Sequence, residues 1–366
     1  MNSIEAVSVN TILDAKGNDA VETEVVTTDG YGRCSFSAPR HATKSAREEI
    51  GALIGRDANQ QADVDELLQD VFEMPNMSMV FSVAVANAAA ASLEMPLYRY
   101  LGGLFANAMP YPLLNIFDAA AGYLVAPIGA NSFSAGIAAS VSIYREFSKL
   151  NVPRGARDVD VLSRLNSIAQ GISDNFGFDI KLGVDFTPVG HTSSYYIEGR
   201  GHTINRAWLS HIIDLIDRYD LCYIQVPFVE SDQSYLAQLR DALHTGCLIA
   251  CDGLPDDNII TGDARRDGYN HTDVALLTPT RTISNVFGRC TEAKSHDLSC
   301  VMLTHTATTC EVSPSHLAVA LSVPFVKLSL KGSENTSKIN ELLRIEQELY
   351  EGSNPRMVKQ PNYEVN

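Results

Sequence analysis

Positively charged residues are scarce in this sequence of 366 residues. It contains 28 lysines and arginines against 44 aspartates and glutamates, which gives a formal net charge of −16 at pH 7. Proteins that bind nucleic acid need a basic surface to neutralise phosphates, and anionic membranes attract basic segments for the same reason. The deficit argues against nucleic acid and membrane surfaces as partners, and it is typical of a soluble protein.

Paired cysteines are also missing. The seven cysteines are scattered and none forms a C-x-x-C pair, so we expect neither a disulfide framework nor a zinc knuckle. Cys222, Cys247 and Cys300 lie inside apolar runs and are predicted to be buried. Reduced, buried thiols indicate a cytoplasmic location.

Long apolar runs are absent as well. No run is long enough to cross a bilayer, and the first residues lack the basic and apolar stretches of a signal peptide. We therefore expect no membrane span. The alanine-rich segment from Ala84 to Ala91 is too short to span and predicts a tightly packed helix instead.

The first hundred residues predict an α+β unit. Apolar and polar positions alternate in residues 4–14 and 20–28, and the intervening glycine and asparagine favour a turn, which indicates a hairpin. A polar stretch covers residues 37–47, and helical patterns follow at 60–73 and 78–102. Strands followed by helices are typical of an α+β arrangement.

Two prolines, Pro110 and Pro112, mark the end of this unit. We therefore predict a smaller α+β domain at residues 1–108 and a second domain at residues 109–366.

After Pro112, short apolar runs alternate with helical patterns. Strands are predicted at Leu113–Phe117, Asp179–Phe186, Leu221–Val226, Cys247–Cys251, Asp273–Leu277, Ser299–Leu303 and Pro324–Leu328. Helices are predicted at Arg206–Tyr219, Ser234–His244, Ile283–Ser295, Ser313–Ser322 and Ser337–Tyr350. This alternation predicts an α/β fold with a parallel sheet, and so many units favour a closed β/α barrel. A doubly wound open sheet is the alternative, although no glycine-rich dinucleotide fingerprint supports it.

In a β/α barrel the active site lies at the carboxyl ends of the strands. The candidate site residues are therefore Asp185, Gln225, Asp252, Thr278, His305 and Lys327.

Four segments resemble the enolase family, in the family's order along the chain. They are Ile12–Asn18, similar to the Asp-Ser-Arg-Gly-Asn signature; Pro96–Gly103, at the end of the N-terminal domain; Leu114–Ile116 with Ala126–Ala130, at the opening of the barrel; and Ser337–Leu349, in the C-terminal helix. The resemblance covers nearly the whole chain and implies an enolase-type β/α barrel preceded by a smaller α+β domain.

Enolase interconverts 2-phosphoglycerate and phosphoenolpyruvate. The resemblance implies that two Mg²⁺ ions stabilise the ene-diolate and that a lysine takes the carbon-bound proton. It also implies a dimer, either of this chain with itself or with a true enolase.

The family's metal ligands are only partly retained. Asp185 and Asp252 fall where the resemblance places two metal aspartates, but Gln225 replaces the glutamate between them. Mg²⁺ prefers anionic oxygen, so a bound Mg²⁺ is expected to be single and weak. The alternative is that both aspartates accept hydrogen bonds from loop amides.

The family's catalytic groups are altered more. Thr278 stands in place of the base lysine, and the Gly-Asp-Glu-Gly-Gly acid and the Gln-Glu pair are not recognisable. The phosphate-binding Ser-His-Arg-Ser has become Thr304 to Ala307, so Thr306 and Ala307 replace the arginine and serine, and only His305 and Lys327 persist.

Three functional hypotheses follow. The first is an enolase homologue without catalysis, which has a binding, assembly or regulatory role. The second is a repurposed lyase that uses Asp185, Asp252, His305 and Lys327 with a remnant Mg²⁺ site. The third is a divergent, active enolase. The inventory favours the first, and a barrel mouth filled by the shortened loop or by Tyr123 would support it further.

Overall fold

The computed structural model describes most of the chain, and the structural statements below concern these residues. They are 1–38, 40–72, 74–119, 121–186, 195–197, 200–202, 206–227, 233–243, 246–252, 272–304, 309–352 and 356–359.

The N-terminal part is a three-stranded antiparallel sheet covered by helices. Its elements are β1 (Ile4–Leu13), β2 (Asp19–Thr27), β3 (Tyr31–Ser37), α1 (Arg40–Glu49), η1 (Ile50–Leu53), α2 (Gln61–Val71), α3 (Pro75–Ser92), α4 (Leu97–Gly102) and η2 (Gly103–Phe105). The predicted hairpin is confirmed, because β1 pairs with β2 antiparallel from Leu13 opposite Asp19. The polar stretch at 37–47, for which we predicted no element, contains α1.

The single helix predicted at 78–102 is wrong, because the chain turns between α3 and α4. Glu94 adopts a positive φ of 53°, outside the right-handed helical region. Pro96 follows two residues later, and helical geometry is disfavoured at Met95, the residue before the proline. The two helices therefore form an angle of 92° rather than one rod.

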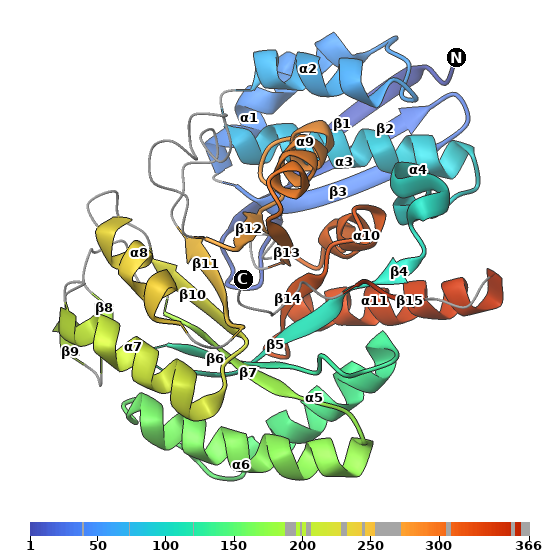
Figure 1. Cartoon of the computed structure of the whole chain (residues 1–366). Helices are drawn as coiled ribbons and strands as arrows, with labels where there is room; N and C mark the ends of the chain where they lie inside the picture. The colour runs from blue at the N-terminus through green and yellow to red at the C-terminus, as the bar shows by residue number, and fades with distance from the viewer. Residues whose placement is uncertain are drawn as a thin grey trace.

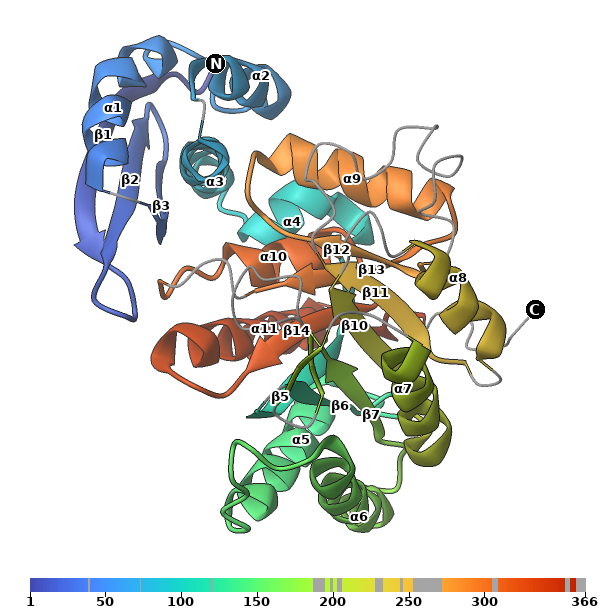
Figure 2. The same cartoon turned by 90° about the vertical axis from the view of Figure 1, so that its left-hand side faces the viewer.

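Helix α3 lies between the N-terminal sheet and the barrel and is buried almost throughout (Figure 2). It approaches β3 so closely that a Cβ atom on Gly32 would lie 2.0 Å from the carbonyl oxygen of Ala84. Glycine is therefore required at this position of the strand. The prediction of a tightly packed helix over Ala84–Ala91 is confirmed.

The second part is a closed barrel of eight strands (Figure 1). Its strands are β5 (Tyr111–Asp118), β6 (Gly122–Ala126), β7 (Lys181–Asp185), β10 (Tyr223–Pro227), β11 (Leu248–Asp252), β12 (Val274–Leu277), β13 (Ser299–Leu303) and β14 (Phe325–Ser329). All seven predicted strands are present. We missed β6, which runs antiparallel to both neighbours, so the sheet is mixed rather than parallel.

Helices surround the barrel, and two short strand pairs lie outside its closed sheet. The helices are α5 (Phe133–Ser148), α6 (Asp158–Phe176), α7 (Arg206–Tyr219), α8 (Gln233–Ala242), α9 (Ile283–Ser295), α10 (Ser313–Ala320) and α11 (Ser333–Gly352). The short strands are β4 (Ala108–Met109) with β15 (Arg356–Met357), and β8 (Tyr195–Ile197) with β9 (Arg200–His202). The architecture is the enolase-type fold expected from the sequence, a smaller α+β part followed by a β/α barrel.

Alternate residues of each strand fill the barrel interior. The apolar cluster inside it includes Leu113, Leu124, Tyr223, Leu276 and Phe325. Because side chains alternate between the two faces of a strand, the residues two positions after Leu113, Tyr223, Leu276 and Phe325 face the same interior, and they are Asn115, Gln225, Thr278 and Lys327. The sequence therefore changes from an apolar core to polar side chains at one end of the barrel, which we call the mouth.

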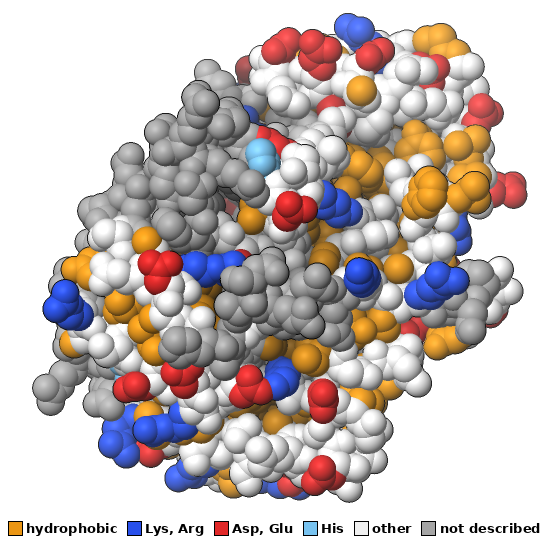
Figure 3. Space-filling model, in the orientation of Figure 1, with side chains coloured by type: hydrophobic (Ala, Val, Ile, Leu, Met, Phe, Trp, Pro, Cys, Tyr) orange, Lys and Arg blue, Asp and Glu red, His pale blue; other side chains and the backbone are white. Residues whose placement is uncertain are grey.

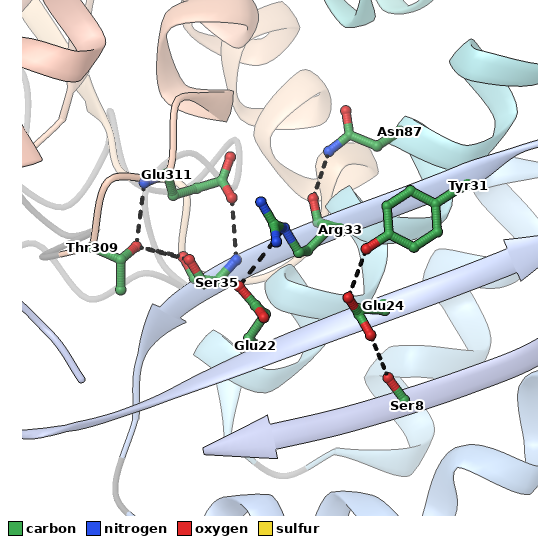
Figure 4. Close-up of polar contacts among 9 residues, drawn as sticks. All are labelled: Ser8, Glu22, Glu24, Tyr31, Arg33, Ser35, Asn87, Thr309 and Glu311. Atoms are coloured by element: carbon green, nitrogen blue, oxygen red, sulfur yellow. Dashed lines mark hydrogen bonds and ion pairs between the residues drawn. The ribbon is translucent and has the colours of Figure 1, made fainter. Parts of the chain in front are cut away.

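The N-terminal part contacts the barrel part through polar groups at several places, including one on β3 and one on α2. At the first, the Ser35 amide donates to Glu311 Oε2 at 3.1 Å, and Thr309 Oγ1 donates to the Ser35 carbonyl at 2.8 Å (Figure 4). At the second, Asp65 of α2 accepts a 2.8 Å hydrogen bond from the Ser284 amide at the start of α9. The division of the chain at residues 108 and 109 stays a prediction.

No single helix in the described ranges is long and apolar enough to cross a membrane. The bent pair Pro75–Ser92 and Leu97–Phe105 passes the same length and composition test only when the two are taken together.

Candidate functional site at the barrel mouth

Three of the predicted site residues come together at the mouth. Asp185 is the last residue of β7, and it lies opposite Gln225 in the parallel pairing of β7 with β10. Lys327 of β14 reaches the same place from across the barrel, and its ammonium group contacts both side chains. The strand-end argument therefore selected residues that the fold brings into contact.

Lys327 is the centre of this cluster. Its Nζ atom forms an ion pair with Asp185 Oδ2 and donates to Gln225 Oε1 at 2.9 Å. Only 11% of the lysine side chain and 17% of the aspartate side chain are exposed. The Thr304 hydroxyl donates to the Lys327 carbonyl at 2.6 Å, which fixes the strand that carries the lysine.

Gln225 is held from a second side. The hydroxyl group of Tyr223 donates to the same Oε1 atom at 2.9 Å, and both residues are almost fully buried. A carbonyl oxygen has two lone pairs, and here a lysine and a tyrosine use both. Since an ammonium group can only donate, the amide must turn its oxygen rather than its nitrogen toward Lys327.

These residues do not fit a Mg²⁺ site as they stand. Mg²⁺ requires several oxygen ligands at about 2.1 Å, and carboxylate oxygens are among its preferred ligands. Here one carboxylate and one amide oxygen already bind a cation, and no group of three His, Cys, Asp or Glu side chains within the described ranges could hold a metal ion. Asp252 is the last residue of β11, paired with Pro227, but its side chain lies outside the described part.

The other predicted positions are less fully described. Thr278 follows β12 directly, and its carbonyl accepts a 2.9 Å hydrogen bond from the Thr280 amide, which turns the chain toward α9. His305, Thr306 and Ala307 lie outside the described residues.

The rim of the mouth contains residues that the sequence did not suggest. Asn115 and Asp118 of β5 are joined by a hydrogen bond, and Lys331 forms an ion pair with Asp118. Gly122 of β6 pairs with Asp185, so this position gives the mouth no side chain. Gly122 was missed because the sequence pattern did not reveal β6, and Asp118 and Lys331 were missed because they lie beyond the ends of the strands predicted from the sequence.

Tyr123 does not fill the mouth. Its ring is fully buried on the outer side of β6, where its hydroxyl donates to Asp158 Oδ1 at 2.5 Å, and His211 Nε2 lies 2.9 Å from the other carboxylate oxygen. Burial, together with the Asp158 charge, raises the pKa of Tyr123. Tyr123 therefore gives no support to the idea of a filled pocket.

No family model matches the sequence. Archaeal enolases match it over nearly their whole length. An enolase from Archaeoglobus fulgidus is 29% identical over 97% of this chain and 99% of the relative. An enolase from Methanosphaera stadtmanae is 26% identical over 97% and 98%, and one from Methanothermobacter thermautotrophicus is 26% identical over 94% and 97%. The chain belongs to the enolase family.

Membership in the enolase family agrees with both the fold and the order of the four sequence segments. It also gives the site positions their context. Within the described residues, the mouth of this enolase homologue holds Asp185, Gln225 and Lys327 in contact, with Thr278 at the end of β12.

Proposed function

We propose that this enolase homologue does not dehydrate 2-phosphoglycerate and that it acts through binding, assembly or regulation. The observation that carries the proposal is the threonine at the end of β12. No lysine occurs between Lys181 and Lys294, so this strand end offers no amine that could take a proton from carbon. A positioned general base contributes typically ~10²–10⁴-fold to a rate.

The state of Lys327 supports the same conclusion. Its ammonium group is engaged by Asp185 and Gln225, so a substrate anion would have to compete with an ion pair that is mostly buried. The carboxylate and amide oxygens are engaged in turn, so the electrostatic sink for an ene-diolate is weakened. Such stabilisation is usually the largest catalytic contribution.

An assembly role has support from the surface. Hydrophobic side chains gather on the face that carries α4 (Figure 3), and Leu104 and Phe105 of η2 are 84% and 85% exposed. Exposed neighbouring apolar residues favour association. Association with a second copy or with a true enolase stays a prediction, which light scattering coupled to size-exclusion chromatography tests.

The proposed loss of catalysis is tested by turnover. The purified protein is incubated with 2-phosphoglycerate and MgCl₂, and phosphoenolpyruvate is followed by its ultraviolet absorbance, with an archaeal enolase as the positive control. We expect no turnover from the wild type or from Thr278→Lys, because Pro279 disturbs the strand end and the other groups stay absent. Turnover at ordinary enzyme rates that Asp185→Ala abolishes would disprove the proposal and favour an active enolase.

A further inference from the structure

We infer that the ammonium group of Lys327 acts as a built-in cation at the barrel mouth, so that this end of the barrel is held together without a divalent metal ion. The inference deepens the proposed function, on which it rests for the loss of metal-dependent catalysis. It assigns to one lysine the structural role of joining β14 to β7 and β10.

Among the three described side chains of the cluster, the charges are balanced without a metal. Asp185 carries one negative charge, Lys327 one positive charge and Gln225 none. A divalent ion placed beside Asp185 would face the fixed positive charge of Lys327, and repulsion between like charges is strong where water is largely excluded. Magnesium could bind there only by displacing the ammonium group.

Displacement would be unfavourable because the lysine has no other described partner nearby. Its side chain is 11% exposed, and a charge left unpaired at such a site is strongly destabilising. Gln225 would also have to give up one of the two hydrogen bonds on Oε1. Mg²⁺ itself loses its hydration shell reluctantly, so Asp185, the carboxylate described in this cluster, would not compensate on its own.

The rim of the mouth provides an internal comparison. Lys331 forms an ion pair with Asp118 on neighbouring strand ends, but these side chains are 45% and 50% exposed. Exposed ion pairs contribute little to stability, whereas breaking a buried one costs much more. The two lysines share chemistry and location and differ in burial, so Lys331 supplies a matched control for Lys327.

The test measures thermal unfolding of the full chain in EDTA and in MgCl₂ with five proteins. These are the wild type, Gln225→Glu, Lys327→Met, Lys327→Met with Gln225→Glu, and Lys331→Met. Methionine has a length similar to lysine without the charge. Calorimetric titration with MnCl₂, using the metal alone as the probe, measures binding directly.

We expect the wild type and Lys331→Met to have the same Tm in EDTA and in MgCl₂. Lys327→Met should lower Tm in EDTA by about 5 °C, because it removes one partner of a buried pair. The double variant, with two carboxylates and no ammonium, should regain about 5 °C when MgCl₂ is ~100-fold above its Kd. Gln225→Glu alone should respond less, because Lys327 still competes.

Two results would overturn the inference. One is a wild type whose Tm rises in MgCl₂ together with tight Mn²⁺ binding, and this result is decisive even if the lysine variants fail to fold. The other is Lys327→Met unfolding at the same temperature as Lys331→Met. The turnover assay on the same samples keeps the two ideas apart: an inactive wild type that binds metal refutes only the built-in cation, whereas an active wild type refutes the proposed function.

Discussion

The contact between α2 and α9 gives the most quantitative prediction about how the two parts of the chain hold together. Asp65 is completely buried. One carboxylate oxygen accepts from Gln61 Nε2 at 2.8 Å, and the other accepts from the Ser284 amide at 2.8 Å. Gln61 keeps other partners if Asp65 is removed, because its amide nitrogen also lies 3.1 Å from Ser82 Oγ.

We therefore predict that Asp65→Ala destabilises the protein mainly by leaving the Ser284 amide buried without an acceptor. An orphaned buried donor costs about 1–3 kcal/mol, and a carboxylate at a helix N-terminus adds about 0.3–1 kcal/mol, so the free energy of unfolding should fall by about 3 kcal/mol. Glu66→Ala, an exposed position on the same helix, should change it by less than about 0.5 kcal/mol.

Asp65→Asn tests the charge separately. Burial raises the pKa of Asp65 above its usual 3.8, so the folded state binds the proton of this carboxyl group more tightly than the unfolded state does. The stability that comes from this tighter proton binding is complete below pH 3.8 and is lost as the pH rises through the raised pKa. Asparagine cannot titrate. The cost of Asp65→Asn relative to the wild type should therefore be larger near pH 4 than at pH 7.

Urea unfolding provides the assay. The single tryptophan, Trp208, is buried on α7 and reports on the barrel, while circular dichroism reports on the whole chain. Coincident transitions would justify a two-state free energy. The reasoning is refuted if Asp65→Ala and Glu66→Ala unfold at the same urea concentration, or if the cost of Asp65→Asn grows with pH.

Two further predictions use the same unfolding assay. Burial lowers the pKa of Lys338 from 10.5 to about 8, so the folded protein releases this proton at a lower pH than the unfolded protein does. The free energy of unfolding of the wild type should therefore rise relative to that of Lys338→Met by up to roughly 3 kcal/mol between pH 8 and 10.5. A difference that stays constant over this pH range would contradict the prediction. Gly32→Ala should lower the free energy of unfolding by more than about 2 kcal/mol, because the new Cβ atom would lie 2.0 Å from a carbonyl oxygen of α3. Gly171→Ala on α6 should raise the free energy of unfolding by roughly 0.5–1 kcal/mol, because its Cβ atom would meet nothing within 4 Å. Equal effects of the two alanines would refute the packing argument.

The sequence predicted those elements whose pattern is local. Alternating runs after Pro112 identified seven barrel strands, because each is short and apolar and most are separated from the next by a helix. Strand β6 escaped detection because it has only five residues, Gly122–Ala126, and follows β5 by a short turn. Its reversed direction depends on pairing with β5 and β7, which no local pattern specifies.

The site was predictable in its positions but not in its contacts. The carboxyl ends of parallel strands meet at one end of a barrel, so Asp185, Gln225 and Lys327 could be chosen from the sequence. The ion pair between Lys327 and Asp185 joins residues 142 positions apart. Its formation depends on how the barrel closes. It also depends on Tyr223, which holds Gln225 from two residues before it and which no sequence pattern singled out.

The antiparallel course of β6 has a consequence for how this protein could change over generations. Its first residue, Gly122, lies at the mouth opposite Asp185, and a Cβ atom there would meet its nearest neighbours at 3.5 to 3.7 Å, which is ordinary contact. A single base change turns a glycine codon into one for aspartate, glutamate, alanine or serine. The mouth can thus acquire a new functional group, an acid included, in one mutational step and without rebuilding the barrel.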